Sequence, residues 1–337
     1  MRHHKLAVLL SYLPLAAANC RPSVGAPISL IDGPAILAVK GQPAEVIPGA
    51  TVTYEVLAVD DTGRIPAPGG DVTSPALWAI CELPKPPIDT NSVNADCLDT
   101  DALPGQPGTT DVSYSAPTPT DACYEFGPLT PPVQPGQPAI QPRSPDVTDG
   151  YYLPVRVGLQ IPADLQRPGT ATPDSIVAFG LQRISCGIAN VPGPIGFDFT
   201  KSYTLNVNPT IDQLTWQQGS ADPTAVPRVE TGSAPIQVES GQTVNLSLSW
   251  TADSVETYPA YDILARVLVS HREAMRVAWY ATGGIFEHDV TGRTETETEV
   301  FAVNSWKSTA TGLIHLWIVL HDSRGGTDFA SFDLQVI

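Results

Sequence analysis

Cysteines carry the most definite chemistry in this sequence of 337 residues, which contains five of them. Cys20 lies near the N-terminus, and the other four are Cys81, Cys97, Cys123 and Cys186. An even number of cysteines in an exported chain predicts two disulfides, although three pairings are open. We favour Cys81 with Cys97, closing a loop rich in Pro and Asp, and Cys123 with Cys186, tying the next long loop to a late strand. A zinc site is the alternative, but the wide spacings and the lack of a C-x-x-C pair argue against it.

Cys20 ends a segment typical of an export signal. Arg2 and Lys5 precede an apolar run over residues 6–10, and small residues follow at 16–18. The apolar stretch is shorter than the roughly 20 residues that cross a bilayer, so residues 1–19 are expected to be a signal peptide that is removed.

The residues LAAANC, at positions 15–20, resemble the lipobox of bacterial lipoproteins, in which the cysteine becomes the first mature residue and is acylated, with palmitate among the chains. The resemblance implies a membrane anchor on Cys20. Asn19 stands where that family prefers Gly, Ala or Ser, and cleavage after Ala18 to give a secreted protein is the alternative. By the sorting rule of the family, Arg21 in place of Asp favours the outer membrane.

Catalytic and metal-binding patterns are weak. A serine nucleophile is commonly marked by a G-x-S-x-G elbow, which the sequence lacks. His315 and His321 alternate onto one strand face near Asp322, yet no ligand pair shows a recognised spacing. Acidic turns, such as the one at Asp60 and Asp61, could hold calcium, but a D-x-D-x-D-G loop is missing and solvated turns are the expectation. We therefore predict no catalytic residues, no metal and no cofactor.

Aromatic side chains are the remaining candidates for ligand contact. Tyr151, Tyr152 and Trp306 lie in or beside expected loops. Such side chains could stack on sugar rings or on a partner protein. We favour the other interpretation, in which they cap the ends of the fold.

Composition narrows the class of protein. Hydrophobic residues make up 42%, while 34 prolines and 27 glycines indicate turns and extended loops rather than long helices. The net charge of −17 makes nucleic acid and anionic membrane surfaces poor partners. The length predicts two domains.

Strand patterns fill both halves of the chain. Period-2 alternation is clear at 51–58 and at 243–250. Between 82 and 150 the sequence becomes a proline-rich connection, which we expect to be a surface loop tied by the disulfides. We predict a tether at 20–34, a first domain at 35–207 that contains this insertion, and a second domain at 208–337.

An internal repeat relates the two halves. The pattern V-x-x-G-x-T-V occurs at 46–52 and again at 238–244, each time before a strand. Trp78 and Trp279 follow within a few tens of residues. We expect each glycine to make a sharp turn between strands and each tryptophan to fill the space between two sheets.

The stretch GLIHLWIVLHDSRGGTDFASFDLQV resembles the last hairpin of Ig-like or PKD-like β-sandwich domains. With PAEVIPGATVTYEVLAVDD, LWAIC, NVNPTIDQL and AWYATGGIFE before it, the whole chain resembles a group of uncharacterised Gram-negative bacterial lipoproteins built from such domains. The resemblance implies an all-β fold of two tandem sandwiches in the cell envelope, and it carries no active site.

These observations predict a cell-envelope lipoprotein that acts as a non-catalytic binding or structural module, with an envelope protein or a glycan as its partner. The alternative is a surface carbohydrate-binding or adhesion module. A hydrolase of an envelope polymer ranks third, because no constellation of catalytic residues is recognisable.

Overall fold

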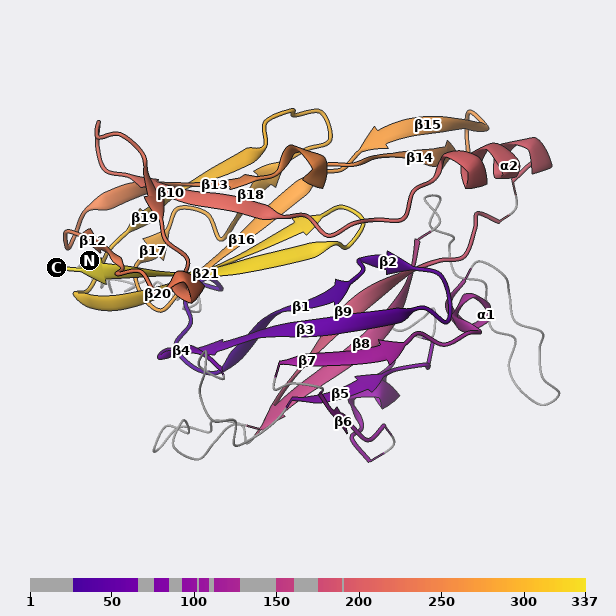
Figure 1. Cartoon of the computed structure of the whole chain (residues 1–337), viewed down its shortest axis with the longest axis horizontal. Coiled ribbons are helices and arrows are strands. Elements are labelled where there is room, and N and C mark those ends of the chain that lie inside the picture. The colour runs from indigo at the N-terminus through magenta and orange to yellow at the C-terminus, as the bar shows by residue number, and fades with distance from the viewer. Residues whose placement is uncertain are drawn as a thin grey trace, which may run out of the picture.

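The computed structural model describes residues 27–65, 76–84, 93–101, 103–108, 112–127, 150–160, 175–189 and 191–337. Cys20, the expected signal segment and about half of the proline-rich insertion lie outside these residues. The predicted fold class is confirmed: the chain is all-β and forms two Ig-like β-sandwiches in tandem, which lie side by side (Figure 1). No helix among the described residues is long and apolar enough to cross a membrane.

The first sandwich consists of two sheets, one with the order β1–β3–β4 and β7 also paired to β3, and one with the order β2–β9–β8–β5–β6. Between them lie Trp78 and Tyr54, with exposures of 0% and 1%. The strands are β1 (Ala35–Gln42), β2 (Glu45–Val46), β3 (Thr51–Asp60), β4 (Gly63–Arg64), β5 (Leu77–Ile80), β6 (Gln106–Pro107), β7 (Ser113–Pro117), β8 (Gly150–Gln160) and β9 (Ser175–Ser185).

The second sandwich pairs a sheet of order β11–β10–β13–β19–β17 with one of order β12–β21–β20–β16–β18. A separate two-stranded ribbon, β14–β15, projects from it beside α2 (Figure 1). The strands are β10 (Ile211–Gln217), β11 (Thr224–Val226), β12 (Ile236–Val238), β13 (Thr243–Trp250), β14 (Thr257–Asp262), β15 (Val267–Arg272), β16 (Met275–Ala281), β17 (Ile285–Phe286), β18 (Val290–Arg293), β19 (Phe301–Lys307), β20 (Gly312–Asp322) and β21 (Thr327–Val336).

Helices are short. The longest in the described residues is α2 (Gly193–Ser202), which begins with a proline in its first turn and has Lys201 in its last, both suited to those ends. It leads into the linker of residues 203–208, which crosses to the second sandwich. The others are η1 (Ala95–Leu98), α1 (Ala122–Phe126), η2 (Val229–Thr231) and η3 (Ala252–Ser254).

The internal repeat marks the same structural step in both sandwiches. β2 pairs in parallel with β9 in the first, and β12 pairs in parallel with β21 in the second. The turn that follows needs a left-handed residue, supplied by Gly49 at φ 82° and Gly241 at φ 77°. Trp78 on β5 and Trp279 on β16 are both fully buried. The predicted roles of glycine and tryptophan are confirmed.

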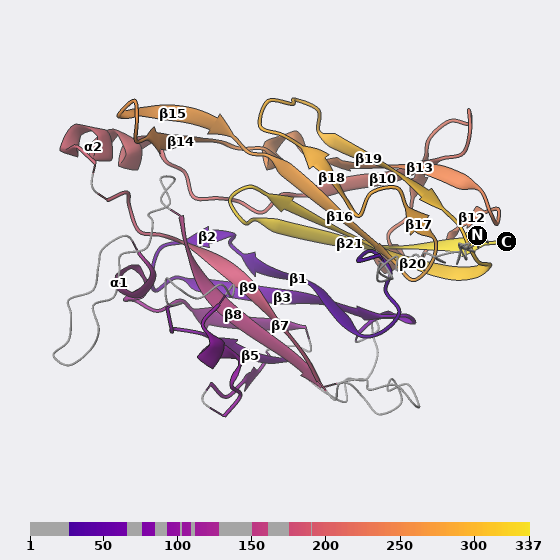
Figure 2. The same ribbon diagram turned by 180° about the vertical axis from the view of Figure 1, so that it is seen from behind.

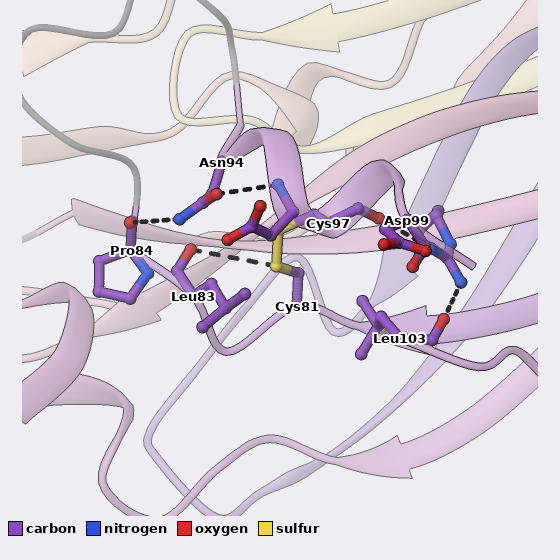
Figure 3. The surroundings of a disulfide bond; sticks show 9 residues. Cys81, Leu83, Pro84, Asn94, Cys97, Asp99 and Leu103 are labelled. Atoms are coloured by element: carbon purple, nitrogen blue, oxygen red, sulfur yellow. Dashed lines mark hydrogen bonds between the residues drawn. A yellow bond between two sulfur atoms is a disulfide. The ribbon is translucent and has the colours of Figure 1, made fainter. Parts of the chain in front are cut away.

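Both favoured disulfides are present. Cys81 and Cys97 have Cα atoms 5.7 Å apart, and Cys123 and Cys186 have Cα atoms 5.3 Å apart. The first joins the end of β5 to η1 (Figure 3). Within the same loop the Asn94 side chain accepts a hydrogen bond from Asp96 N and donates one to Pro84 O.

Arg156 of β8 holds the loop that follows η1. Its guanidinium is buried and donates to the carbonyl oxygens of Cys97, at 2.8 Å, Asp99, at 3.2 Å, and Leu103. Burial lowers the pKa of Arg156, and the charge of Asp99 opposes that shift. The described segment around η1 is therefore fastened by one disulfide and one arginine.

The two sandwiches pack face to face along an apolar seam formed by β1 and β3 of the first and β20 of the second. The buried side chains in it are Ile31, Ala38, Leu57, Val59, Trp317 and Val319. Lys40 pairs with Asp328 across the seam at 2.8 Å.

Part of the predicted tether belongs to this folded body. Ile31 N donates to Ala281 O at 2.9 Å, and Ala281 N donates to Ser29 O at 2.8 Å. Residues 29–31 thus extend the edge of the second sandwich at the end of β16.

Candidate functional site

The aromatic side chains predicted to contact ligand do not form an exposed set. Trp306 is 1% exposed, packs in the core of the second sandwich and donates its indole N–H to Gly283 O at 3.1 Å. The prediction is wrong because β19 continues through Trp306, whose place in the alternation directs it inward with Ala302.

The two tyrosines at the start of β8 are also taken up by the fold. Tyr151 is 4% exposed and packs with α1. The Tyr152 hydroxyl accepts a hydrogen bond from Arg183 Nη1 at 3.0 Å, and the Arg183 guanidinium lies 5.8 Å from the centre of its ring. Neither residue can act as an exposed stacking platform as predicted.

Where the two sandwiches meet, six ionisable side chains come together that the sequence analysis did not connect. We call this set the charged junction. Glu45 of β2 and Arg183 of β9 come from the first sandwich, and the turn between β20 and β21 inserts Arg324 beside them. The members are Glu45, Arg183, Glu256, Glu273, Asp322 and Arg324.

Arg324 is the centre of the junction. Its Nε donates to Glu273 Oε1 at 2.7 Å and its Nη2 to Glu256 Oε2 at 2.7 Å, while its Nη1 lies 3.9 Å from Glu45 Oε2. The guanidinium also stacks on Tyr258, 4.7 Å from the ring centre. Arg324 is 1% exposed and Glu273 and Glu45 are fully buried, whereas the Glu256 side chain is 20% exposed.

Glu45 and Arg183 form the part of the junction that belongs to the first sandwich. Arg183 Nε lies 3.2 Å from Glu45 Oε1, and both side chains are buried. Gly150, which pairs with Ser185 at the start of β8, makes room for the guanidinium, since a Cβ there would overlap it.

The linker joins both halves of the junction. Tyr203 Oη donates to Glu45 at 2.9 Å and accepts from Arg183 Nη2 at 3.0 Å. Asn206 N donates to Glu45 Oε2 at 2.8 Å, and Asn206 Nδ2 donates to Asp322 at 3.1 Å. The segment between the sandwiches is therefore bonded to each of them.

Two carboxyl groups of the junction have raised pKa values. Burial raises the pKa of Glu273 to about 7, with repulsion from Asp322 adding to the shift and Arg324 opposing it. Burial also raises the pKa of Asp322, while hydrogen bonds from Gly326, Asn206 and Arg324 lower it.

A strongly shifted pKa is often the mark of an active site, but buried ion-pair networks produce it too. Glu273 has no exposed surface, and its two oxygens accept from Arg324 and from Glu256 N. Because its carboxylate is occupied by the protein itself, we assign the junction a structural role.

The other residues considered as metal ligands do not form a common site. His315 Nδ1 lies 2.8 Å from Asp333 Oδ1, and His321 Nδ1 lies 3.0 Å from Thr327 Oγ1, so the two imidazoles have separate partners. Asp60 Oδ1 accepts from the backbone N–H and the hydroxyl of Thr62, as in an ordinary turn. Within the described residues no group of three His, Cys, Asp or Glu side chains is placed to hold a metal ion.

One hollow lies on the outer face of the second sandwich. It has a volume of about 440 Å³ and lies over β10, β13 and β19, with the loop containing Glu287 and His288 along one side. The sequence showed only alternating polar residues here, so the hollow could not be anticipated. We call it the polar groove.

No protein-family model and no curated protein matches the chain. Among solved structures it is similar to the fibronectin(III)-like modules of Clostridium thermocellum CbhA, with 9% identity, 89% of this chain and 94% of that chain covered, and a TM-score of 0.23. It is similar to the tandem Ig repeats of Dlar, with 12% identity, 91% and 98% covered, and a TM-score of 0.22. The D0–D1 domain of intimin gives 8% identity, 89% and 98% covered, and a TM-score of 0.21. Similarities this low carry no argument, and the architecture described above rests on strand pairing.

Proposed function

We propose that this protein is a cell-envelope lipoprotein that acts as a rigid, non-catalytic binding or structural module. The observation that carries the proposal is the contact between its two sandwiches. An apolar seam, a buried charged junction and a bonded linker hold them face to face. Domains that share a chain usually move relative to each other unless their interface is large and apolar. Because the apolar seam, the charged junction and the linker all join the two sandwiches, we expect the protein to be rigid and to present binding surfaces in a fixed arrangement.

The proposed location rests on the N-terminal pattern and on the disulfides. Two disulfides fit an oxidising compartment outside the cytoplasm. The export signal and Cys20 supply the proposed lipid anchor, and Arg21 favours the outer membrane. Residues 29–31 already belong to the folded body. The nine residues from Cys20 can span at most about 30 Å, so the anchored body would stay close to the bilayer.

The experiment is expression of the full chain in a Gram-negative host, followed by membrane fractionation and mass spectrometry of the N-terminus. The proposal expects a mature chain that begins at Cys20, carries acyl mass and sediments with the outer membrane. Cys20→Ala is the matched control, and it should leave the protein unprocessed or soluble. A mature chain that begins at Asn19 without acyl mass would contradict the anchor.

A carbohydrate-binding or adhesive module is the second candidate. Tyr151 and Trp306 are buried and Tyr152 is engaged by Arg183, so the polar groove is the observation in its favour.

A further inference from the structure

The floor of the polar groove consists mostly of uncharged polar side chains. Cross-strand pairing places Gln217, Asn245 and Ser305 in one row across β10, β13 and β19, and Thr215, Ser247 and the exposed Val303 in the next. Asn245 Oδ1 accepts a hydrogen bond from Ser305 Oγ at 3.2 Å. Amides and hydroxyls each offer a donor and an acceptor, so the floor can both donate hydrogen bonds to a ligand and accept them from it.

The rim of the groove is held in place by a buried amide. Asn304 is 4% exposed, and its side chain accepts from His288 N at 3.2 Å and donates to His288 O at 2.7 Å. Glu287 N also donates to Ser305 O at 2.9 Å. The backbone of both rim residues is thus fixed, while their side chains are each 62% exposed.

The chemistry of the lining defines the ligand class. Among the described residues that line the groove there is no Lys or Arg, which argues against phosphate or another anion. One carboxylate is too few for a polycation. Leu246, Val303 and Pro223 are its aliphatic members, too few to bind an acyl chain. A neutral ligand rich in hydroxyl groups fits this lining, since amides and a carboxylate can pair with neighbouring hydroxyls.

We propose that the polar groove binds a short segment of a neutral oligosaccharide. The inference deepens the proposed function, because it names a ligand class for the module. The volume falls within the range of small-ligand sites. Since the lining contains no Phe, Tyr or Trp, recognition rests on hydrogen bonds alone, and we expect dissociation constants of about 1 mM.

The test is NMR titration of the full chain with maltohexaose, cellohexaose and chitohexaose, followed through the side-chain amide signals of Asn245 and Gln217. The double variant Asn245→Ala/Ser247→Ala should weaken binding at least tenfold. Thr243→Ala is the matched control, because Thr243 lies on the same strand and face beyond the groove, and it should bind like wild type. Thermal unfolding of each variant verifies that it is folded.

Glu287→Gln separates ligand classes. It removes the rim charge but keeps hydrogen-bonding capacity, so a neutral sugar should bind within about threefold of wild type, whereas a cationic ligand would be lost. The inference is overturned if none of the three sugars shifts these signals at 10 mM, if binding survives the double variant, or if Glu287→Gln abolishes it. A chain that is acylated at Cys20 yet binds no sugar would sink this inference and leave the proposed function standing.

Discussion

Arg324 keeps its charge although it is almost fully buried. Burial alone would lower its pKa, but Glu273 beside it raises the pKa above the usual value. Removing one partner of a buried ion pair leaves the other charges unpaired, which costs about 3–5 kcal/mol. Arg324→Ala should therefore lower the free energy of unfolding by that amount in urea denaturation. Arg276→Ala, at an exposed position on β16, should change it by less than about 0.5 kcal/mol. Equal effects of the two variants would contradict the importance of the junction.

Glu273 makes the protein less stable as the pH rises, which is the opposite of the usual effect of a paired carboxylate. Its pKa is raised from 4.5 to about 7 in the folded chain, so the folded state binds this proton more tightly than the unfolded state. The resulting stabilisation is complete below pH 4.5 and is lost as the pH rises through about 7. At about 1.4 kcal/mol for each pKa unit, a rise from 4.5 to about 7 sets an upper bound of about 3–4 kcal/mol. We expect Glu273→Gln to remove this dependence.

The measurement is urea denaturation of wild type and Glu273→Gln at intervals between pH 4.5 and 8. His321 acts in the opposite sense, because burial lowers its pKa and its stabilisation is lost as the pH falls below 6.5. The pKa of Asp322 is also raised, so the wild-type curve alone mixes all three groups. The difference between the two curves gives the contribution of Glu273. A difference that stays constant across this range would show that Glu273 does not titrate there.

At the scale of elements, a glycine-to-alanine substitution tests whether the turn shared by both repeats requires a left-handed backbone conformation. Gly241 is at φ 77°, and a Cβ there would meet no atom within 4 Å. Gly241→Ala should cost about 1–2 kcal/mol from backbone conformation alone. Gly49→Ala should cost more, since its Cβ would also press on Thr120 at 3.2 Å. Chemical denaturation of both variants compares the two losses of stability. If Gly241→Ala does not change the free energy of unfolding, the left-handed turn does not explain why glycine occurs in both repeats.

The elements themselves could be predicted because they follow from local rules. Alternation revealed β13, the glycine repeat revealed the shared turn, and the cysteine count gave two disulfides. The sequence places Trp306 wrongly because it predicts a loop where β19 continues to Lys307. The charged junction could not be found from the sequence, since Glu45, Glu273 and Arg324 are distant in the chain and each resembles a surface charge until the sandwiches meet.

A signal for the seam was nevertheless present in two strands. In β3 the residues Val56 and Ala58 point into the sandwich, while Leu57 and Val59 fill the seam. β20 behaves likewise, with Leu316, Ile318 and Leu320 in the core and Trp317 and Val319 in the seam. A strand that is buried on both faces is apolar without alternation. Such runs in an otherwise alternating chain indicate a second layer of packing.

At the scale of the molecule, side-by-side packing has a consequence for how the chain unfolds. Figure 2 shows from behind that β1 and β3 run beneath the second sandwich. An end-to-end pair of domains would lack this shared face. Because the seam and the junction belong to both sandwiches, neither can unfold without exposing apolar surface and buried charge on the other. We expect calorimetry of the wild-type chain to show a single cooperative transition.

Trp317→Ala should uncouple the sandwiches. Trp317 is 1% exposed in the seam, and replacing a buried tryptophan with alanine costs about 3–5 kcal/mol. With the shared face weakened, calorimetry should resolve two transitions, the lower belonging to the less stable sandwich. Phe301→Ala removes an aromatic ring from the opposite sheet of the same sandwich, where it is 39% exposed, and should keep one transition. Two transitions already in the wild type would mean that the seam does not couple the domains.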